Sequence, residues 1–433
     1  MKELFYDAAV IGGGAAGMAA ALELDAAGFS CAIIDREDHL GGILMQCIHN
    51  GFGLHEFSEE LTGPEYAERF IEQVLNSGIK VYLNTTVTNF SNVCDSGFTQ
   101  AGRSGSRLLT CISPDGVMRL WCTALILAMG CRERNRGNVQ IPGTRPAGIF
   151  TAGLAQRLVN IEGYIPGKDA VIIGSGDIGL IMARRMMWAG CNVKAVIEIM
   201  PYPAGLTRNI VQCLNDFKIP LYLSCQATSV FGNDRVEGVE VSPLENGVQI
   251  PSKRFRIDCD TVLLSVGLIP ENELSRAAGV ALSGDTGGPL VDSMLMTNKE
   301  GVFACGNALH VHDLADWVTR ESRTAGRYAA QWLEELNTAG FDHPKLQIQA
   351  KAGANVRYIC PSRINPKKEN SIYLRPLTVI NDAVLELKLD NKIFRSIRKN
   401  QVQPSQMINL ILGPDDFKDA ELTFNSVLEF KID

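Results

Sequence analysis

A glycine-rich turn between an apolar strand and an Ala-rich helix constrains the fold of this chain more than any other feature. The run from Ala8 to Ile11 is apolar without alternation, which is typical of a parallel strand covered on both faces. Three glycines follow at G-x-G-x-x-G spacing: Gly12, Gly14 and Gly17. A helical stretch then ends near Gly28, and a second apolar strand, 31–34, stops at Asp35. This order of elements predicts a βαβ dinucleotide-binding unit.

Each position of this unit has a physical role. Gly12 permits the tight turn, Gly14 lets the backbone approach a pyrophosphate, and Gly17 lets the helix lie close to the sheet. The helix N-terminus offers unpaired N–H groups and the positive end of its dipole to phosphates. Asp35 is suited to accept hydrogen bonds from an adenosine ribose, and the expected site includes its neighbour Arg36.

The same pattern recurs from residue 169 as DAVIIGSGDIGLIMARRMMWAGCNVKAVIEI. Its glycines have the same spacing: Gly174, Gly176 and Gly179. The second strand of this copy, 193–197, ends at Glu198, whose carboxylate would bond a free ribose 2′-OH and repel a 2′-phosphate. We therefore expect a second dinucleotide site that prefers NAD(H) to NADP(H). The alternative is a vestigial second copy that binds nothing.

Length and charge narrow the class of protein. A chain of 433 residues is long enough for about three domains. The net charge of −7 gives no basic surface for nucleic acid or an anionic membrane, so neither partner is expected. The first strand begins within a few residues of Met1, which leaves no room for a signal peptide. No apolar run approaches the roughly 18 residues of a spanning helix, and we expect a cytoplasmic protein.

The 12 cysteines are scattered and mostly lie in apolar segments, as expected of buried reduced thiols. No C-x-x-C occurs, so the sequence offers neither a thioredoxin-like redox pair nor a zinc or iron–sulfur ligand set. His310 and His312 with Asp313 have metal-binding side chains at a loop-to-helix junction. Alternate residues there do not share a helical face, and we assign no metal site.

The rest of the chain divides into further elements. A helix is predicted over 62–78, a hairpin from 107–112 and 118–122, and a separate apolar strand over 124–129. From about residue 345 the sequence alternates locally and has Asp-Asn and Gly-Pro turns, which predicts a small antiparallel β domain of sandwich type. Its charged segment 395–399 is interpreted as a solvated face.

The order of the motifs GGGAAG, LGG, LILAMG, GSGDIG and GVFACGN resembles the pyridine nucleotide-disulfide oxidoreductase superfamily. This resemblance implies an α/β fold with two Rossmann-like domains, the NAD-binding domain being inserted in the FAD-binding domain. The chain more closely resembles the bacterial FAD/NAD oxidoreductase that accompanies anaerobic glycerol-3-phosphate dehydrogenase. It is more distantly similar to subunits of opine and sarcosine oxidases and of hydrogen cyanide synthase. The implied domains are an FAD domain (1–145 and 266–338), an NAD domain (146–265) and the C-terminal β domain (345–433).

The resemblance also assigns residues to the cofactors. It adds Gly42 to the FAD site, brings the Val87 backbone to the adenine end, and places Gly130 near the dinucleotide, with Gly267 following its own strand as Gly130 does. The closing Gly-Asp motif of the family is Gly306-Asn307 here, and an Asn can still hydrogen-bond a flavin hydroxyl. The helix after this motif would aim its N-terminus at the flavin ring.

One departure from the family concerns its disulfide. Reductases of the superfamily have C-x-x-x-x-C after LGG or C-x-x-C in the NAD domain, whereas this chain has only Cys47 after Gly42. Dithiol chemistry is therefore not expected, and the shared activity is hydride transfer between NAD(H) and FAD.

The motifs and the resemblance leave three alternative functions open. The chain is an oxidoreductase subunit that exchanges electrons with a partner dehydrogenase of glycerol-3-phosphate type, as the resemblance implies. Alternatively, Cys47 is a redox cysteine whose pKa is lowered by His49, in a reductase of peroxides or disulfides. If Cys47 has no redox role, it is simply a small buried side chain. In a third alternative the flavoprotein is a scaffold subunit without catalysis.

Overall fold

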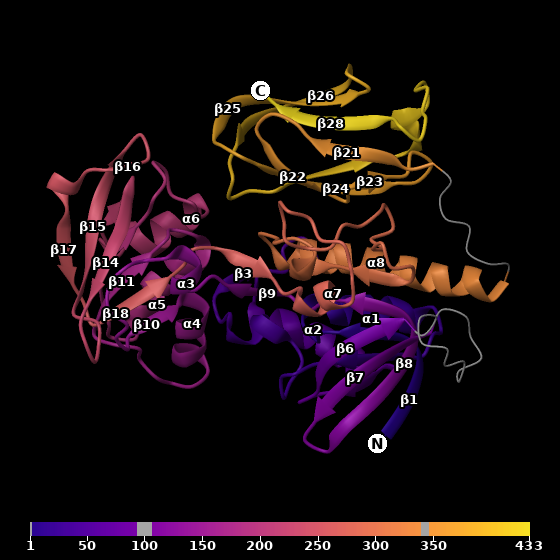
Figure 1. Cartoon of the computed structure of the whole chain (residues 1–433), viewed down its shortest axis with the longest axis horizontal. Coiled ribbons are helices and arrows are strands. Elements are labelled where there is room, and N and C mark those ends of the chain that lie inside the picture. Colours follow the sequence, from indigo (N-terminus) through magenta and orange to yellow (C-terminus); the bar gives the residue numbers. More distant parts are fainter. Residues whose placement is uncertain (1, 93–105, 339–345) are drawn as a thin grey trace. The chain divides into compact units, whose positions relative to one another are not determined.

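The computed structural model describes residues 2–92, 106–338 and 346–433 (Figure 1). The chain forms two compact units. The first comprises Met1–Met45, Asn50–Cys131 and Pro270–Asp433, and the second comprises Gln46–His49 and Arg132–Ile269. The inserted unit thus begins at Arg132, earlier than the residue 146 expected from the sequence. It also includes the short segment Gln46–His49, which follows the first glycine-rich unit.

The first unit is built on a seven-stranded sheet with the order β5-β2-β1-β8-β7-β6, and β20 also pairs with β8. The strands are β1 (Lys2–Ile11), β2 (Cys31–Ile34), β5 (Lys80–Tyr82), β6 (Thr86–Asn92), β7 (Arg107–Ser113), β8 (Gly116–Leu127) and β20 (Val302–Ala304). β1 pairs in parallel with both β2 and β8. Its residues Ala8, Ala9 and Val10 are fully buried, which explains their apolar run without alternation.

The hairpin strand and the apolar strand expected at 118–122 and 124–129 form one continuous strand, β8. Its first half pairs antiparallel with β7, for example Met118 with Cys111, while the whole strand runs parallel to β1. Thr123, which lies between the two predicted segments, is buried within this strand. Local patterning does not reveal such a fusion, because both halves are strand-like by themselves.

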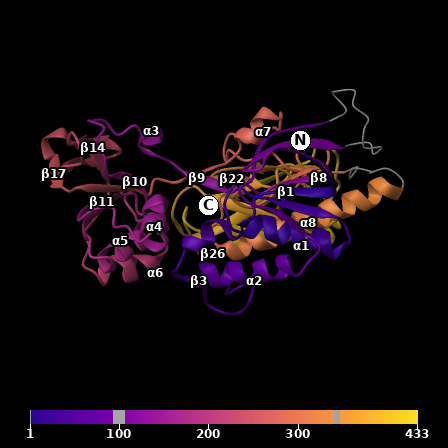
Figure 2. The same ribbon diagram turned by 90° about the horizontal axis from the view of Figure 1, so that it is seen from below.

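Three long helices cover this sheet: α1 (Ala15–Ala26), α2 (Gly63–Leu75) and α8 (Ala315–Thr338). α2 begins with a capping box, in which Thr62 and Glu65 bond each other's backbone N–H groups. α1 lies against α8 in both views (Figures 1 and 2). The two helices approach closely at Gly326, where a Cβ would lie 2.4 Å from the Ala20 carbonyl oxygen. Shorter elements of this unit are β3 (Asn50–Phe52), β4 (Leu61–Thr62), α7 (Glu273–Ala277), η5 (Gly306–Ala308) and η1 (Gly42–Gln46), whose last residue belongs to the second unit.

The second unit has a parallel sheet with the order β10-β18-β11-β12-β13. Ile172 of β11 packs on the helical side with α4 and α5, whereas Val171 packs against the strands β14 and β15 on the other side. The sheet and its helices are β10 (Ile149–Thr151), β11 (Asp169–Ile173), β12 (Asn192–Ile197), β13 (Leu221–Tyr222), β18 (Thr261–Leu264), α4 (Ala152–Asn160) and α5 (Asp177–Trp188). The covering strands are β14 (Cys225–Phe231), β15 (Gly238–Glu245), β16 (Val248–Gln249) and β17 (Phe255–Asp258).

Short elements complete the second unit and its connections. They are β9 (Cys131–Glu133), α3 (Arg136–Val139), α6 (Thr207–Ile210), η3 (Val211–Asn215), η4 (Pro251–Lys253) and β19 (Leu268–Pro270). β9 pairs with β19, and these strands lie at the two ends of the stretch Arg132–Ile269, which makes up most of the second unit.

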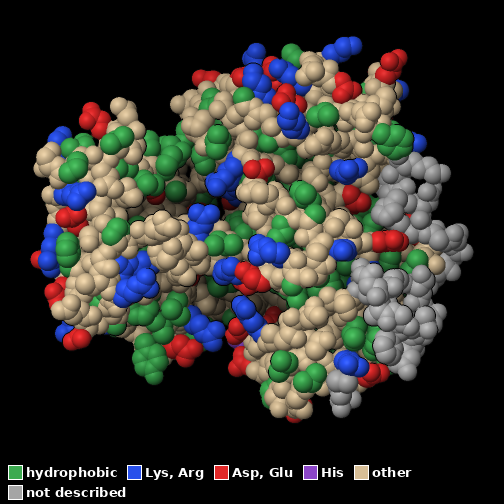
Figure 3. Space-filling model, viewed as in Figure 1, with side chains coloured by type: hydrophobic (Ala, Val, Ile, Leu, Met, Phe, Trp, Pro, Cys, Tyr) green, Lys and Arg blue, Asp and Glu red, His purple; other side chains and the backbone are tan. Residues whose placement is uncertain are grey.

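The C-terminal residues form two sheets around their own apolar core, with the orders β23-β21-β28-β25-β26 and β22-β24-β27. The elements are β21 (Ile348–Ala352), β22 (Val356–Cys360), β23 (Arg363–Ile364), β24 (Asn370–Pro376), β25 (Ile380–Leu389), β26 (Lys392–Val402), β27 (Ile408–Leu412), η6 (Pro414–Phe417) and β28 (Val427–Ile432). The expected all-antiparallel domain is corrected at one place, because β28 returns between β21 and β25 and pairs with β21 in parallel. Figure 3 shows Lys and Arg side chains mixed with Asp and Glu at the upper edge, where Figure 1 draws β25 and β26.

No helix within the described parts of the chain combines the length and the apolar composition that a membrane crossing requires.

Candidate functional site

The turn after β1 has the geometry that its three glycines predicted. Gly12 has a φ of +110°, and a Cβ there would lie 2.3 Å from the Ala128 carbonyl oxygen. A Cβ at Gly17 would lie 1.8 Å from the Gly12 carbonyl oxygen, so α1 packs directly on the turn. At Gly14 the nearest atom to a Cβ is 3.9 Å away, at Gly42. Two glycines are thus required by the fold, whereas Gly14 keeps its outer side open.

This open side faces the N-terminus of α1, which begins after Gly14 without a side-chain cap. The first N–H groups of a 12-residue helix therefore remain available to an anion beside the turn. Gly42 adjoins the same point, because a Cβ there would lie 3.2 Å from the Cα of Gly14, and Gly41 donates a hydrogen bond to the Gly13 carbonyl oxygen at 2.9 Å. The LGG motif thus forms the second wall of the turn.

Asp35, the residue directly after β2, is hydrogen-bonded to this turn. Its Oδ2 accepts a hydrogen bond from the Gly13 amide at 2.5 Å, and its Oδ1 accepts one from the Glu37 amide at 2.9 Å. A carboxylate has about four acceptor positions, so Asp35 retains the capacity to bond a ribose hydroxyl.

A cavity of about 440 Å³ opens beside Asp35 in the first unit. Its lining brings together four residues predicted from the sequence: Gly12, Asp35, Arg36 and Val87. It also contains Glu271, which precedes α7, and Glu273, the first residue of α7. Both lie more than 230 residues after Asp35 and were not predicted from the sequence. Gly130, with a φ of +72°, accepts a hydrogen bond from the Glu271 amide at 3.0 Å and has open space where a Cβ would lie.

The Gly306-Asn307 motif lies next to the start of α1, where a Cβ at Gly306 would come within 2.7 Å of the Ala16 Cβ. The Asn307 Oδ1 accepts a hydrogen bond from the His312 amide at 2.9 Å. Its Nδ2 lies 3.6 Å from the Cys131 sulfur, a weak acceptor. The amide therefore presents its donor side to that region, whereas the usual Asp of this motif has only acceptors.

His310 and His312, to which the sequence assigns no role, both lie next to Glu321 of α8. His310 Nε2 lies 2.8 Å and His312 Nε2 lies 3.3 Å from the same carboxylate oxygen of Glu321, and all three side chains are buried. The other oxygen of Glu321 accepts a hydrogen bond from the Gly306 amide at 2.8 Å. The possible ligand atoms of these three side chains lie within 4.8 Å of one another. The carboxylate is hydrogen-bonded on both oxygens, and we interpret the group as a buried polar network behind the Gly306 turn.

Asp313, the third residue of the sequence motif, lies outside this network. Its Oδ1 lies 2.6 Å from Arg375 Nη2 of β24, and its Oδ2 accepts a hydrogen bond from the Met407 amide at 2.5 Å. The Tyr358 hydroxyl of β22 bonds the Val311 carbonyl oxygen at 3.4 Å. The C-terminal strands thus hold the loop between Asn307 and α8. Glu321 was missed because the sequence gives no sign that a residue of a later helical turn reaches back to this loop.

The second glycine-rich turn repeats the geometry of the first. Gly174 has a φ of +95°, and a Cβ there would lie 2.0 Å from the Ser265 carbonyl oxygen. A Cβ at Gly179 would lie 2.7 Å from the Gly174 carbonyl oxygen, while at Gly176 the nearest atom is 3.4 Å away. α5 begins after Gly176 without a side-chain cap. Gly267, which follows β18, has a φ of +96°. Its carbonyl oxygen accepts a hydrogen bond from the Arg134 amide at 3.0 Å, just as the Gly130 carbonyl oxygen accepts one from the Glu271 amide.

Glu198 takes the position of Asp35 in this second copy. Its Oε2 accepts hydrogen bonds from the Ser175 amide at 2.9 Å and the Ser175 hydroxyl at 2.5 Å, and its Oε1 accepts one from the Met200 amide at 2.9 Å. The side chain is buried. Asp177 in the first turn of α5 accepts bonds from the Leu206 amide and from Asn209, and was not predicted.

Cys47 lies in the second unit, against α4. Its sulfur is 3.7 Å from the Gln156 amide oxygen, and burial raises the pKa of its thiol to about 12. Burial, together with the positive charges of Arg184 and Arg208, lowers the pKa of His49 to about 4. A neutral His49 provides no charge to stabilise a thiolate, so both groups are uncharged near pH 7. None of the cysteines in the described ranges forms a disulfide.

Two βαβ units with open glycine turns and strand-end acids define a protein with two dinucleotide-binding folds. Residues 6–329 match the pyridine nucleotide-disulphide oxidoreductase family, and the chain belongs to this family. The family uses FAD and NAD(P)H, so the protein is an oxidoreductase with these cofactors. The open sides of Gly14 and Gly176 and the uncapped helices after them fit two dinucleotides.

Several characterised proteins are similar to this chain. An opine oxidase subunit from Agrobacterium tumefaciens is 26% identical over 350 residues, which cover 75% of this chain and 65% of that protein. The HcnB subunit of hydrogen cyanide synthase from Pseudomonas aeruginosa is 24% identical over 294 residues, covering 63% of this chain and 59% of the relative. The chain therefore spans less than two thirds of the length of these relatives. Thioredoxin reductase of T. acidophilum shares the fold, with a TM-score of 0.61, 24% identity, and coverage of 76% of this chain and 98% of that one.

Proposed function

We propose that this chain is the NADH-linked flavoprotein subunit of a two-component dehydrogenase, and that its partner is a dehydrogenase of glycerol-3-phosphate type. FAD and NAD(H), when bound, supply hydride transfer and a route for electrons to or from the partner. The single observation that carries the proposal is the presence of two matching glycine-rich turns, each hydrogen-bonded to the acid that follows the next strand, Asp35 or Glu198. The opine oxidase and hydrogen cyanide synthase relatives are both named as subunits, which supports a companion chain.

The protein's own residues are assigned to binding and orientation. The first turn, with Gly12, Gly14 and Gly17, would hold the FAD pyrophosphate, and Asp35 its ribose. Asn307 would donate a hydrogen bond to the flavin side chain from its Nδ2, because its Oδ1 is already bonded to the His312 amide. Further residues assigned to FAD are Arg36, Gly42, Val87, Gly130 and Gly306.

The second turn would hold NAD(H) in the same manner. Its residues are Gly174, Gly176, Gly179, Glu198 and Gly267. We infer a preference for NADH, because a 2′-phosphate would approach the negative charge of Glu198 in a buried position. This proposal requires no cysteine, since the thiol of Cys47 is protonated near neutral pH.

The direct test is an anaerobic titration of the purified chain. A yellow protein whose flavin absorbance is bleached stoichiometrically by NADH, and far less readily by NADPH, is expected. The partner is tested separately by adding a glycerol-3-phosphate dehydrogenase chain and glycerol 3-phosphate. Reduction of the flavin only when both are present supports the partner. A flavin that NADH does not reduce contradicts the oxidoreductase assignment, whereas reduction by NADH without any coupling contradicts only the partner.

A further inference from the structure

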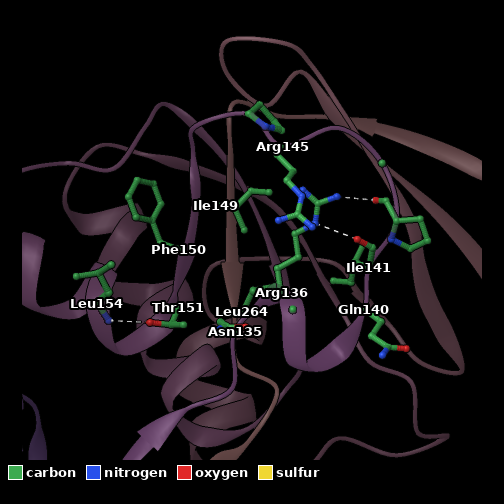
Figure 4. A pocket seen from close by; sticks show the side chains of 14 residues that line it. Asn135, Arg136, Gln140, Ile141, Arg145, Ile149, Phe150, Thr151, Leu154 and Leu264 are labelled. Carbon is green, nitrogen blue, oxygen red and sulfur yellow. Dashed lines mark hydrogen bonds between the residues drawn. The ribbon is translucent and has the colours of Figure 1, made fainter.

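The second unit contains a cavity of about 690 Å³ that the proposed function does not use. It lies along β10 and beside Leu264 at the end of β18, and is closed on one side by the segment 135–146 (Figure 4). Neither the glycine turn at 174–179 nor Glu198 contributes to its lining. Its size is within the range of about 300–1,000 Å³ that small-molecule sites occupy.

Two arginines supply the charge of this cavity, and its lining contains no Asp or Glu. Arg136 is held rigidly, because its guanidinium donates hydrogen bonds to the carbonyl oxygens of Ile141 at 2.9 Å, Pro142 at 2.8 Å and Thr144. Arg145 lies beside it, as Figure 4 shows, and makes neither a hydrogen bond nor an ion pair with any part of the chain that the structure describes. The cavity therefore has one fixed cation and one cation with all its donors available.

The neighbourhood of two cations without an acid is electrostatically unfavourable. Burial, with a contribution from Arg145, lowers the pKa of Arg136, as expected for two neighbouring guanidinium groups. An oxyanion between them would relieve this repulsion and accept hydrogen bonds from both groups in the fork geometry that arginine offers to carboxylates and phosphates.

The opposite wall of the cavity is apolar. It is formed by Ile149 and Phe150 of β10, Leu154 of α4 and Leu264 of β18. An inorganic ion would leave this wall exposed to water, whereas a ligand with a hydrocarbon or aromatic body would cover it.

We propose that this cavity is a binding site for a small organic anion, in which Arg145 and Arg136 bind a carboxylate or phosphate group and the wall around Phe150 binds the apolar body of the ligand. The site is distinct from the proposed NAD(H) site and can be tested without reference to it.

The test uses isothermal titration of the FAD-loaded full-length protein with four probes: benzoate, phenyl phosphate, inorganic phosphate and the neutral benzamide. One molecule of benzoate or phenyl phosphate is expected to bind per chain, and which of the two binds more tightly identifies the anionic group. Benzamide and inorganic phosphate are expected to bind at least about tenfold more weakly, because each lacks one of the two interactions.

The matched variants are Arg145→Gln and Arg398→Gln. Both arginines are exposed and have no described partner, so neither variant is expected to change folding. Arg145→Gln is expected to weaken anion binding at least about tenfold, while Arg398→Gln on β26 leaves it within about twofold. The proposal is overturned if neither organic anion binds at about 10 mM, if Arg145→Gln has no effect, or if NADH displaces the anion competitively. Flavin reduction by NADH in Arg145→Gln reports on the proposed function independently.

Discussion

The Glu198 carboxylate accepts hydrogen bonds from both the amide and the hydroxyl of Ser175, so the acid at the end of β12 is fastened to the glycine-rich turn. The same relation exists between Asp35 and Gly13 in the first unit. In each copy the strand-end acid bonds the glycine-rich turn, in addition to the ribose contact that we propose. A change at this acid is therefore expected to affect both coenzyme choice and local stability.

Replacing Glu198 by Gln removes the negative charge and places an amide donor among the donors of Ser175 and Met200. We expect the preference for NADH over NADPH to fall by about tenfold and stability to decrease by about 1–3 kcal/mol. Ratios of kcat/KM for the two coenzymes and urea unfolding measure the two effects. Glu245→Gln, at an exposed position of β15, is the control. An unchanged coenzyme ratio would show that Glu198 does not approach the 2′ position.

The first turn allows two Gly→Ala changes to be compared. Gly14→Ala is expected to fold normally, since its φ of −78° suits alanine and the nearest atom to the new methyl is 3.9 Å away. The methyl would obstruct the approach of a pyrophosphate, so the flavin content after purification should fall severalfold. Gly17→Ala would press a methyl to within 1.8 Å of a carbonyl oxygen, and we expect loss of folded protein.

Flavin absorbance per chain, together with far-ultraviolet circular dichroism, distinguishes these two outcomes. A Gly14→Ala protein that retains full flavin would contradict the assignment of the pyrophosphate to this turn.

The thiol of Cys47 should react very slowly. With a pKa of about 12, roughly one molecule in ten thousand is a thiolate at pH 8. We expect slow labelling by iodoacetamide in the folded protein, a labelling rate that still rises with pH above 10, and unchanged NADH-dependent turnover in Cys47→Ser. Peptide mass spectrometry measures the labelling. Detection of a sulfenic acid at Cys47, or loss of peroxide or disulfide turnover in the Ser variant, would instead support the single-cysteine reductase.

Glu321 predicts a dependence of stability on acid pH. Burial by itself raises the pKa of its carboxyl, but His312 and His310 outweigh burial and hold the pKa at about 2. A pKa below the ordinary value of 4.5 means that the folded state favours the ionised form. The resulting stabilisation is complete above about pH 4.5, is lost as the pH falls toward 2, and amounts to at most about 3 kcal/mol.

Urea unfolding at a series of pH values measures this loss. Glu321→Gln should be less stable at pH 6 and should show a smaller decrease between pH 4.5 and 2, whereas Glu300→Gln, at an exposed position, should behave as the unmodified protein. An identical acid dependence in the Glu321 and Glu300 variants would show that Glu321 is not ionised in the folded state.

The two glycine-rich units were predictable because their conformation depends on residues that are close together in the sequence. A buried parallel strand is apolar throughout, and a turn that a Cβ would obstruct has to contain glycine, so the sequence of residues 8–35 already contains the geometry. The fusion of the two predicted segments into β8 was not predictable, because it depends on β1 and β7 pairing with the same strand over different stretches.

The environment of single side chains was the least predictable part of the candidate site. Cys47 and His49 have reactive side chains, but their burial and the arginines near His49 come from helices more than 100 residues away. Glu321 joins His310 and His312 only because α8 folds back along the loop that precedes it. Such proximity has no signature in one sequence.

The bonds that Asp313 makes to Arg375 and to the Met407 backbone give the C-terminal strands a role beyond that of an appendage. The loop they hold connects the Gly306-Asn307 motif to α8, so a protein shortened before β21 would lose the outer support of this motif, which we assign to FAD. Engineering that treats the last 90 or so residues as a removable tag, or exchanges them for another module, would have to supply a substitute anchor for this loop.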